Sequence, residues 1–196
     1  MHRFLLACVL AILALDSASA HTGVGATAGF AHGLNHPLSG LDHILAMLAV
    51  GLFAAMLRGR ALWLVPLSFV AMMIAGCAFG LAGMMVPVPE LGIGLSVIVL
   101  GIVVALGVRM PLAGAMALAG FFAIFHGYAH GAEMPGTASG LTYAAGFTLA
   151  TAALHAAGVG LGLGAGRLGQ AYGRRAAQGA GALIAVIGLV LLTVAV

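Results

Sequence analysis

Two short stretches of the sequence hold most of its metal-binding chemistry. The first, "HPLSGLDH", spans residues 36–43, and the second, "FHGYAHGAE", spans residues 125–133. Their candidate ligands are His36, Asp42, His43, His126, His130 and Glu133. Imidazole nitrogen combined with carboxylate oxygen suits a borderline divalent ion such as Ni²⁺, Co²⁺ or Zn²⁺, whereas thiolates favour Cu(I) or iron–sulfur clusters. Both stretches lie in apolar surroundings, where ionisable groups are costly and mark ion or proton pathways.

The composition is that of a membrane protein. The chain is 63% hydrophobic and 6% charged, and its mean hydropathy is +1.22, whereas a soluble domain is roughly 25% charged. All seven basic residues are arginines. Without lysine, the chain cannot form a P-loop nucleotide site or a Schiff base with pyridoxal phosphate. The few scattered arginines also indicate no nucleic-acid partner.

The first 20 residues have the three regions of a secretory signal peptide. A short basic start, "MHR", is followed by the apolar "FLLACVLAILAL" and by the small-residue end "DSASA". We expect cleavage after Ala20, which makes His21 the first mature residue. The α-amine and imidazole of His21 would then form a chelating pair, and His32 is a further, less certain ligand. An uncleaved anchor helix is the alternative for residues 1–20.

The remainder, residues 21–196, is predicted to be one all-α, polytopic membrane domain with six transmembrane helices, because each apolar segment approaches the roughly 20 residues needed to cross a bilayer. The predicted spans are 37–57, 62–86, 91–108, 111–131, 139–163 and 177–195. Gly76 and Gly80, and the series Gly158, Gly162 and Gly166, predict close helix packing in the lipid bilayer. Such stripes are also compatible with a homo-oligomer.

Arginine placement predicts the orientation of the domain. Every arginine after the signal peptide follows an odd-numbered span: Arg58, Arg60, Arg109, Arg167, Arg174 and Arg175. Cytoplasmic loops are enriched in basic residues. We therefore expect a multi-pass protein of the bacterial cytoplasmic membrane with both mature termini in the periplasm. A cleaved signal peptide places the mature N-terminus on the same side.

Helix geometry predicts how the two stretches meet. If Pro37 is the first helical residue, His36 is the N-cap, and at about 1.5 Å per residue His43 lies near the depth of His126 on the fourth span. Asp42 and His43 point about 100° apart on a regular helix. Both can therefore bind one ion only if the helix is distorted, for which Gly40 is a plausible point, or if one acts from the second shell. His155, in the fifth span, is expected to be a structural hydrogen-bonding residue.

At these residues the sequence resembles the HupE/UreJ family. "HPLSGLDH" is similar to the signature HP-x-x-G-x-D-H, and "FHGYAHGAE" to F-H-G-x-A-H-G-x-E, in the same order and over the whole chain. The resemblance implies a secondary permease for nickel, sometimes cobalt, that supplies hydrogenase or urease maturation. It also implies that the six candidate ligands are the metal-site positions. Ni²⁺ or Co²⁺ is then the transported ion, with no tightly bound cofactor and no enzymatic activity.

Two other classes of protein remain open at this point. One is an intramembrane zinc-dependent hydrolase that uses a His/Asp-bound zinc and Ser39, although the sequence lacks H-E-x-x-H. The other is a b-type haem protein with histidines on facing helices. Donor chemistry does not separate nickel from cobalt, because both ions accept the same ligands.

Overall fold

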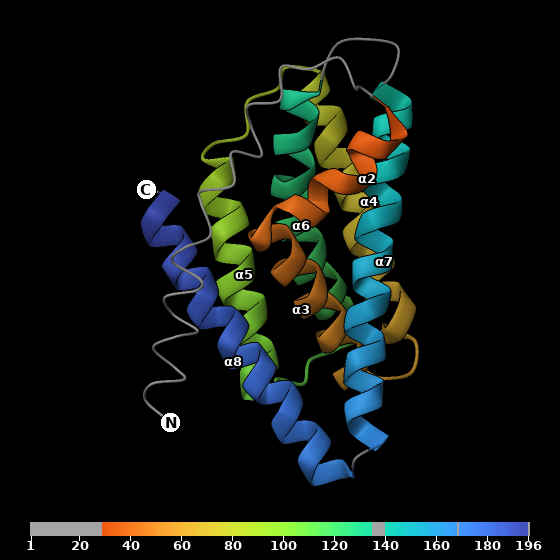
Figure 1. The fold of residues 1–196 in the computed structure, drawn as a ribbon, viewed down its shortest axis with the longest axis vertical. Helices are drawn as coiled ribbons and strands as arrows, with labels where there is room; N and C mark the ends of the chain where they lie inside the picture. Colours follow the sequence, from red (N-terminus) through yellow and green to blue (C-terminus); the bar gives the residue numbers. More distant parts are fainter. Residues whose placement is uncertain (1–28, 135–139, 168, 196) are drawn as a thin grey trace.

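The fold is a bundle of α-helices in a computed structural model that describes residues 29–134, 140–167 and 169–195 (Figure 1). The predicted signal peptide and His21 lie outside the described residues. Within the described ranges all regular structure is helical. The helices are α2 (Phe30–Ser39), α3 (Leu41–Leu57), α4 (Ala61–Leu81), α5 (Pro89–Leu106), α6 (Leu112–Glu133), α7 (Gly140–Arg167) and α8 (Gln170–Ala195).

Five of these helices, α4 to α8, are long and apolar enough to cross a membrane. The count becomes six if the bent pair α2 and α3 is one span. In Figure 1, α2 lies obliquely across the upper part of the bundle, and α3 turns down from its end toward the connection to α4. Five of the six predicted spans therefore correspond to continuous helices, and the first predicted span corresponds to the bent pair α2 and α3.

The break in the first span lies at Gly40, and the prediction that Pro37 begins the helix is wrong. Pro37 is inside α2, and α3 begins after Gly40, whose φ of −95° and ψ of 117° are extended. The two helices meet at an angle of 83°. His36 therefore belongs to the last turn of α2 rather than to an N-cap, and it lies on a different helix from His43.

Helix α3 is the centre of the bundle. It contacts each of the other described helices, and most of its side chains are buried, with Met47, Val50 and Phe53 fully enclosed. A helix that is apolar on every side is expected in such a position. The first turn of this central helix carries Asp42 and His43, so the fold places these polar groups among the surrounding helices.

Glycines allow the helices to pack at close range. A Cβ atom at Gly76 or Gly127 would collide with the backbone of the facing helix in the α4–α6 pair, at Ile124 and Met73 respectively. Small residues permit this approach in membranes, where packing and hydrogen bonds drive helix association. The predicted packing role of Gly76 is confirmed, and the tight α4–α6 pair holds His126 and His130 at fixed positions opposite α3.

Candidate metal site

The corner between α2 and α3 is stabilised by local hydrogen bonding. The Ser39 hydroxyl donates to the His36 carbonyl at 2.7 Å, which satisfies one of the carbonyl groups left open at the end of a helix. Gly40 follows directly, and a Cβ atom there would lie 2.8 Å from Asp42 Oδ1 and 3.1 Å from His43 Nδ1. The glycine is therefore required to make room for these two side chains.

Asp42 and His43 are partners of each other. Asp42 Oδ1 accepts the His43 backbone N–H at 2.8 Å and lies 2.9 Å from His43 Nδ1. A carboxylate in this position holds the hydrogen on Nδ1, so we infer that the other ring nitrogen of His43, Nε2, carries a lone pair. Of the two predicted arrangements, a distorted helix and a second-shell residue, the structure has both: the helix begins anew at Gly40, and Asp42 supports the ring of His43.

Nε2 of His43 points across the bundle to α6. It lies 2.6 Å from Nε2 of His130, and both side chains are buried. Two ring nitrogens at this distance share a hydrogen, and the lone pair inferred for His43 makes His130 the donor. The prediction that the two sequence stretches meet at one depth is thus confirmed by a direct contact between them.

Two further histidines contact this pair. The ring of His36 is 4.6 Å from that of His130, and the ring of His126 is 4.8 Å from that of His43, measured between centroids; both pairs are edge-on. Four imidazoles from α2, α3 and α6 therefore form one cluster. We call these four residues, His36, His43, His126 and His130, the histidine cluster.

His126 is oriented by a residue that the sequence reasoning missed. Ser96 on α5 is fully buried; its hydroxyl donates to the Ile93 carbonyl at 2.6 Å and lies 2.8 Å from His126 Nε2. Because the hydroxyl hydrogen is used on the carbonyl, we infer that His126 Nε2 is a donor to Ser96. His126 Nδ1 is then a buried lone pair, and it has no hydrogen-bond partner. A lone serine in an otherwise apolar span was the available signal.

His32 and Glu133 lie near the ends of α2 and α6. His32 is exposed on α2, with its ring 6.0 Å from that of His36. Glu133 is the last residue of α6, one helical turn beyond His130. The structure therefore brings together four of the six main candidates with Asp42 behind His43, and it leaves Glu133 at the helix end and His32 at the outer margin.

His155 on α7 is a further buried histidine. Its side chain is 1% exposed, and neither ring nitrogen has a hydrogen-bond partner. The expectation that it forms a structural hydrogen bond is therefore wrong. The ring of Phe69 lies between it and the cluster, with its centroid 5.0 Å from His155 and 5.6 Å from His126. Buried polar groups without partners are uncommon and costly, so His155 calls for a functional explanation.

An apolar crevice adjoins the cluster. It has a volume of about 190 Å³, is bounded by α4, α6 and α7, and reaches His130. Its lining includes the sulfur-bearing side chains Met73, Cys77 and Met134. Cys77 is a free cysteine. Soft ligands therefore lie near the cluster, beside the imidazole and carboxylate donors.

The cluster is not arranged as a closed metal site. In the described part of the chain, no group of three or more His, Cys, Asp or Glu side chains is placed to hold a metal ion as it stands. Nitrogens that share one ion are about 3 Å or more apart, since each bond is about 2.0–2.1 Å long, whereas the two Nε2 atoms are 2.6 Å apart. Binding therefore requires a small separation of α3 and α6 and loss of the shared hydrogen.

These features define a class of protein: a multi-pass, all-helical membrane protein with a largely buried histidine cluster between α2, α3 and α6. Comparison with known proteins gives the family. The family described as HupE / UreJ protein matches residues 9–191. Protein HupE of Rhizobium leguminosarum bv. viciae is 45% identical over 184 residues, which cover 93% of this chain and 94% of the relative. The chain belongs to the HupE/UreJ family. No solved structure gives a significant match.

Proposed function

We propose that the protein is a secondary transporter that imports a divalent transition-metal cation, Ni²⁺ or Co²⁺, across the cytoplasmic membrane for hydrogenase or urease maturation. The contact between His43 on α3 and His130 on α6 is the observation that carries the proposal. It unites the two sequence stretches of the family resemblance in one buried group of nitrogen ligands. Imidazole ligands suit nickel and cobalt.

The proposed site comprises His36, Asp42, His43, His126, His130 and Glu133, on the side of the membrane opposite the arginine-bearing loops. Asp42 acts through His43, because its carboxylate faces His43 Nδ1. Such partners fix the tautomer and raise the basicity of a ligating histidine. The ion takes the place of the hydrogen shared between the two Nε2 atoms, and that hydrogen moves to Nδ1 of His130, so both histidines bind as neutral imidazoles.

The histidines also outline a path through the bundle. His36 contacts His130, His130 contacts His43, and His43 contacts His126. Beyond Phe69, the unpartnered nitrogens of His155 provide the next lone pair. An ion can thus pass from one ligand to the next and keep a partner at each step. This avoids the main cost of moving a charge through a low-dielectric interior, which is the loss of its water without replacement ligands.

The orientation follows from the arginines. With the arginine-bearing loops in the cytoplasm, the cluster faces the periplasm and both termini lie outside. The inside-negative potential then favours inward movement of a doubly charged ion by about 4.6 kcal/mol per 100 mV, twice the single-charge value. This drive requires no nucleotide, which agrees with the absence of lysine from the sequence.

Uptake of radioactive nickel by cells expressing the protein tests the proposal. Wild type should accumulate nickel, and cobalt should compete more strongly than zinc or magnesium. His43→Ala and His130→Ala should each lose most of the uptake at equal membrane abundance, whereas His32→Ala, outside the contact, should retain it. Equal uptake by all four proteins and by cells lacking the protein would overturn the proposal.

The alternatives gain no support from the structure. The Ser39 hydroxyl, which a zinc-dependent hydrolase would need as a nucleophile, is committed to the His36 carbonyl. A haem iron between two histidines separates their nitrogens by about 4 Å, twice a metal–nitrogen bond of about 2 Å, and the His43–His130 pair is far closer.

A further inference from the structure

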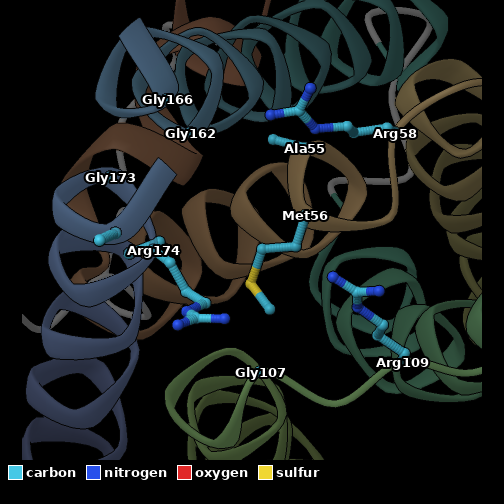
Figure 2. A pocket seen from close by; sticks show the side chains of 11 residues that line it. Ala55, Met56, Arg58, Gly107, Arg109, Gly162, Gly166, Gly173 and Arg174 are labelled. Atoms are coloured by element: carbon cyan, nitrogen blue, oxygen red, sulfur yellow. The ribbon is translucent and has the colours of Figure 1, made fainter. Parts of the chain in front are cut away.

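A second cavity lies at the opposite end of the bundle from the histidine cluster. Its volume is about 460 Å³, and it is bounded by the end of α3, the turn after α5, the end of α7 and the start of α8 (Figure 2). Three arginines from three separate segments line it: Arg58, Arg109 and Arg174. Figure 2 shows their side chains arranged around Met56 and Gly107. The rest of the lining is alanine and glycine.

Within the described ranges, none of these three side chains forms an ion pair or a side-chain hydrogen bond. The acidic residues of these ranges occupy the other end of the bundle: Asp42 and Glu90 lie in the first turns of α3 and α5, and Glu133 is the last residue of α6. Three like charges around one cavity repel one another, so an anion in the cavity would stabilise the arrangement.

We propose that this cavity binds the phosphate of an anionic phospholipid from the leaflet at this end of the protein. Guanidinium groups match phosphate oxygens with paired hydrogen bonds. Basic pockets between transmembrane helices bind anionic headgroups, and the small apolar lining leaves space for the glycerol portion. The site is separate from the histidine cluster and does not depend on the proposed transport function. Free phosphate offers the same chemistry, so the experiment distinguishes the two sources.

The charge test uses two triple variants of the full-length protein, purified in detergent. The first is Arg58→Gln with Arg109→Gln and Arg174→Gln. The matched control is Arg60→Gln with Arg167→Gln and Arg175→Gln, which removes the same charge from the same end of the bundle but from residues that do not line the cavity. Lipid binding is counted by native mass spectrometry with phosphatidylglycerol, phosphatidylcholine or inorganic phosphate as the ligand.

Wild type should bind phosphatidylglycerol in preference to phosphatidylcholine. The cavity variant should bind it about a hundredfold more weakly, since each arginine near an anionic lipid contributes roughly fivefold. The control variant should stay within about threefold of wild type. Equal weakening in both variants would overturn the proposal in favour of diffuse charge attraction. Displacement of the lipid by millimolar inorganic phosphate would assign the site to a soluble anion instead.

A shape test keeps every charge and guards against misfolding of the triple variants. A Cβ atom at Gly166 would meet only Arg58 Nη2, at 3.6 Å, so Gly166→Leu should fill the cavity without a backbone collision. Gly164→Leu is the control, because that position is exposed and meets nothing within 4 Å. Gly166→Leu should weaken phosphatidylglycerol binding at least tenfold and Gly164→Leu should not. Unchanged binding in Gly166→Leu would overturn the assignment.

Discussion

Replacement of Gly40 by alanine should damage the metal site while leaving the fold intact. The φ of −95° and ψ of 117° at this position are open to alanine, and a Gly→Ala change at a compatible position stabilises a protein by about 0.4–1 kcal/mol. The new methyl group, however, would lie 2.8 Å from Asp42 Oδ1 and 3.1 Å from His43 Nδ1. The gain from the stiffer backbone is therefore offset by the disturbed Asp42–His43 contact, so stability should change little while function falls.

The size of the effect follows from these distances. The carboxylate must withdraw by about 0.6 Å, from 2.8 Å to the 3.4 Å of an ordinary contact. That movement breaks the 2.9 Å contact with His43 Nδ1 and leaves the ring without its support. Loss of such a partner typically costs 10–100-fold in metal affinity. We therefore expect the nickel concentration for half-maximal uptake to rise by about 10–100-fold.

The assay is the initial rate of radioactive nickel uptake as a function of nickel concentration. Membrane abundance and thermal unfolding are measured on the same preparations. Gly160→Ala is the matched control, because its Cβ atom would meet nothing within 4 Å. If Gly40→Ala takes up nickel with the same concentration dependence as Gly160→Ala, then the Asp42–His43 contact does not set affinity and the reasoning is refuted.

Three further predictions concern the surroundings of the cluster. Ser96→Ala should lower the free energy of unfolding by about 1–3 kcal/mol, because it leaves a buried N–H of His126 unpaired. The thermal unfolding temperature and the nickel uptake should both fall. An unchanged unfolding temperature would contradict the hydrogen bond between Ser96 and His126. His155→Leu should keep or raise the thermal unfolding temperature, because no hydrogen bond is lost, but it should reduce the maximal rate of nickel uptake. Full uptake would show that His155 is not part of the ion path. Cys77→Ala should leave nickel uptake within about twofold of wild type, since nitrogen and oxygen donors are available, and a large loss would indicate sulfur ligation.

Sequence patterns predicted the helices well because their signals are local. Long apolar runs, separated by Pro, Gly and Arg, predicted the ends of α4 to α8 to within about five residues, apart from the start of α8, which lies earlier than predicted. The main error was in the first span, where Pro37 was taken as its start. Proline is favoured at the first helical position, but here α2 packs against α7 and continues through the proline. Whether the first span is interrupted at Pro37 or at Gly40 depended on tertiary packing.

The sequence predicted which residues form the candidate site better than it predicted how they are arranged. Residue type and depth predicted that His43 lies near His126, and the structure adds the direct contact between His43 and His130. Ser96 was signalled only by being a lone serine in an apolar span, and Phe69 was not signalled, because one phenylalanine in an apolar helix carries no distinctive pattern. The buried state of His155 also depends on the surrounding helices. Whether the cluster binds a metal, and whether Glu133 and His21 take part, remain predictions.

The central claim is that imidazoles of the histidine cluster bind the transported ion. X-ray absorption at the nickel edge, on purified protein loaded with one equivalent of nickel, tests it most directly. The claim predicts nitrogen and oxygen ligands with the outer-shell scattering of at least two imidazoles, and loss of part of that scattering in His43→Ala. A spectrum with sulfur ligands, from the adjacent Met73, Cys77 and Met134, or one unchanged in His43→Ala, would contradict it.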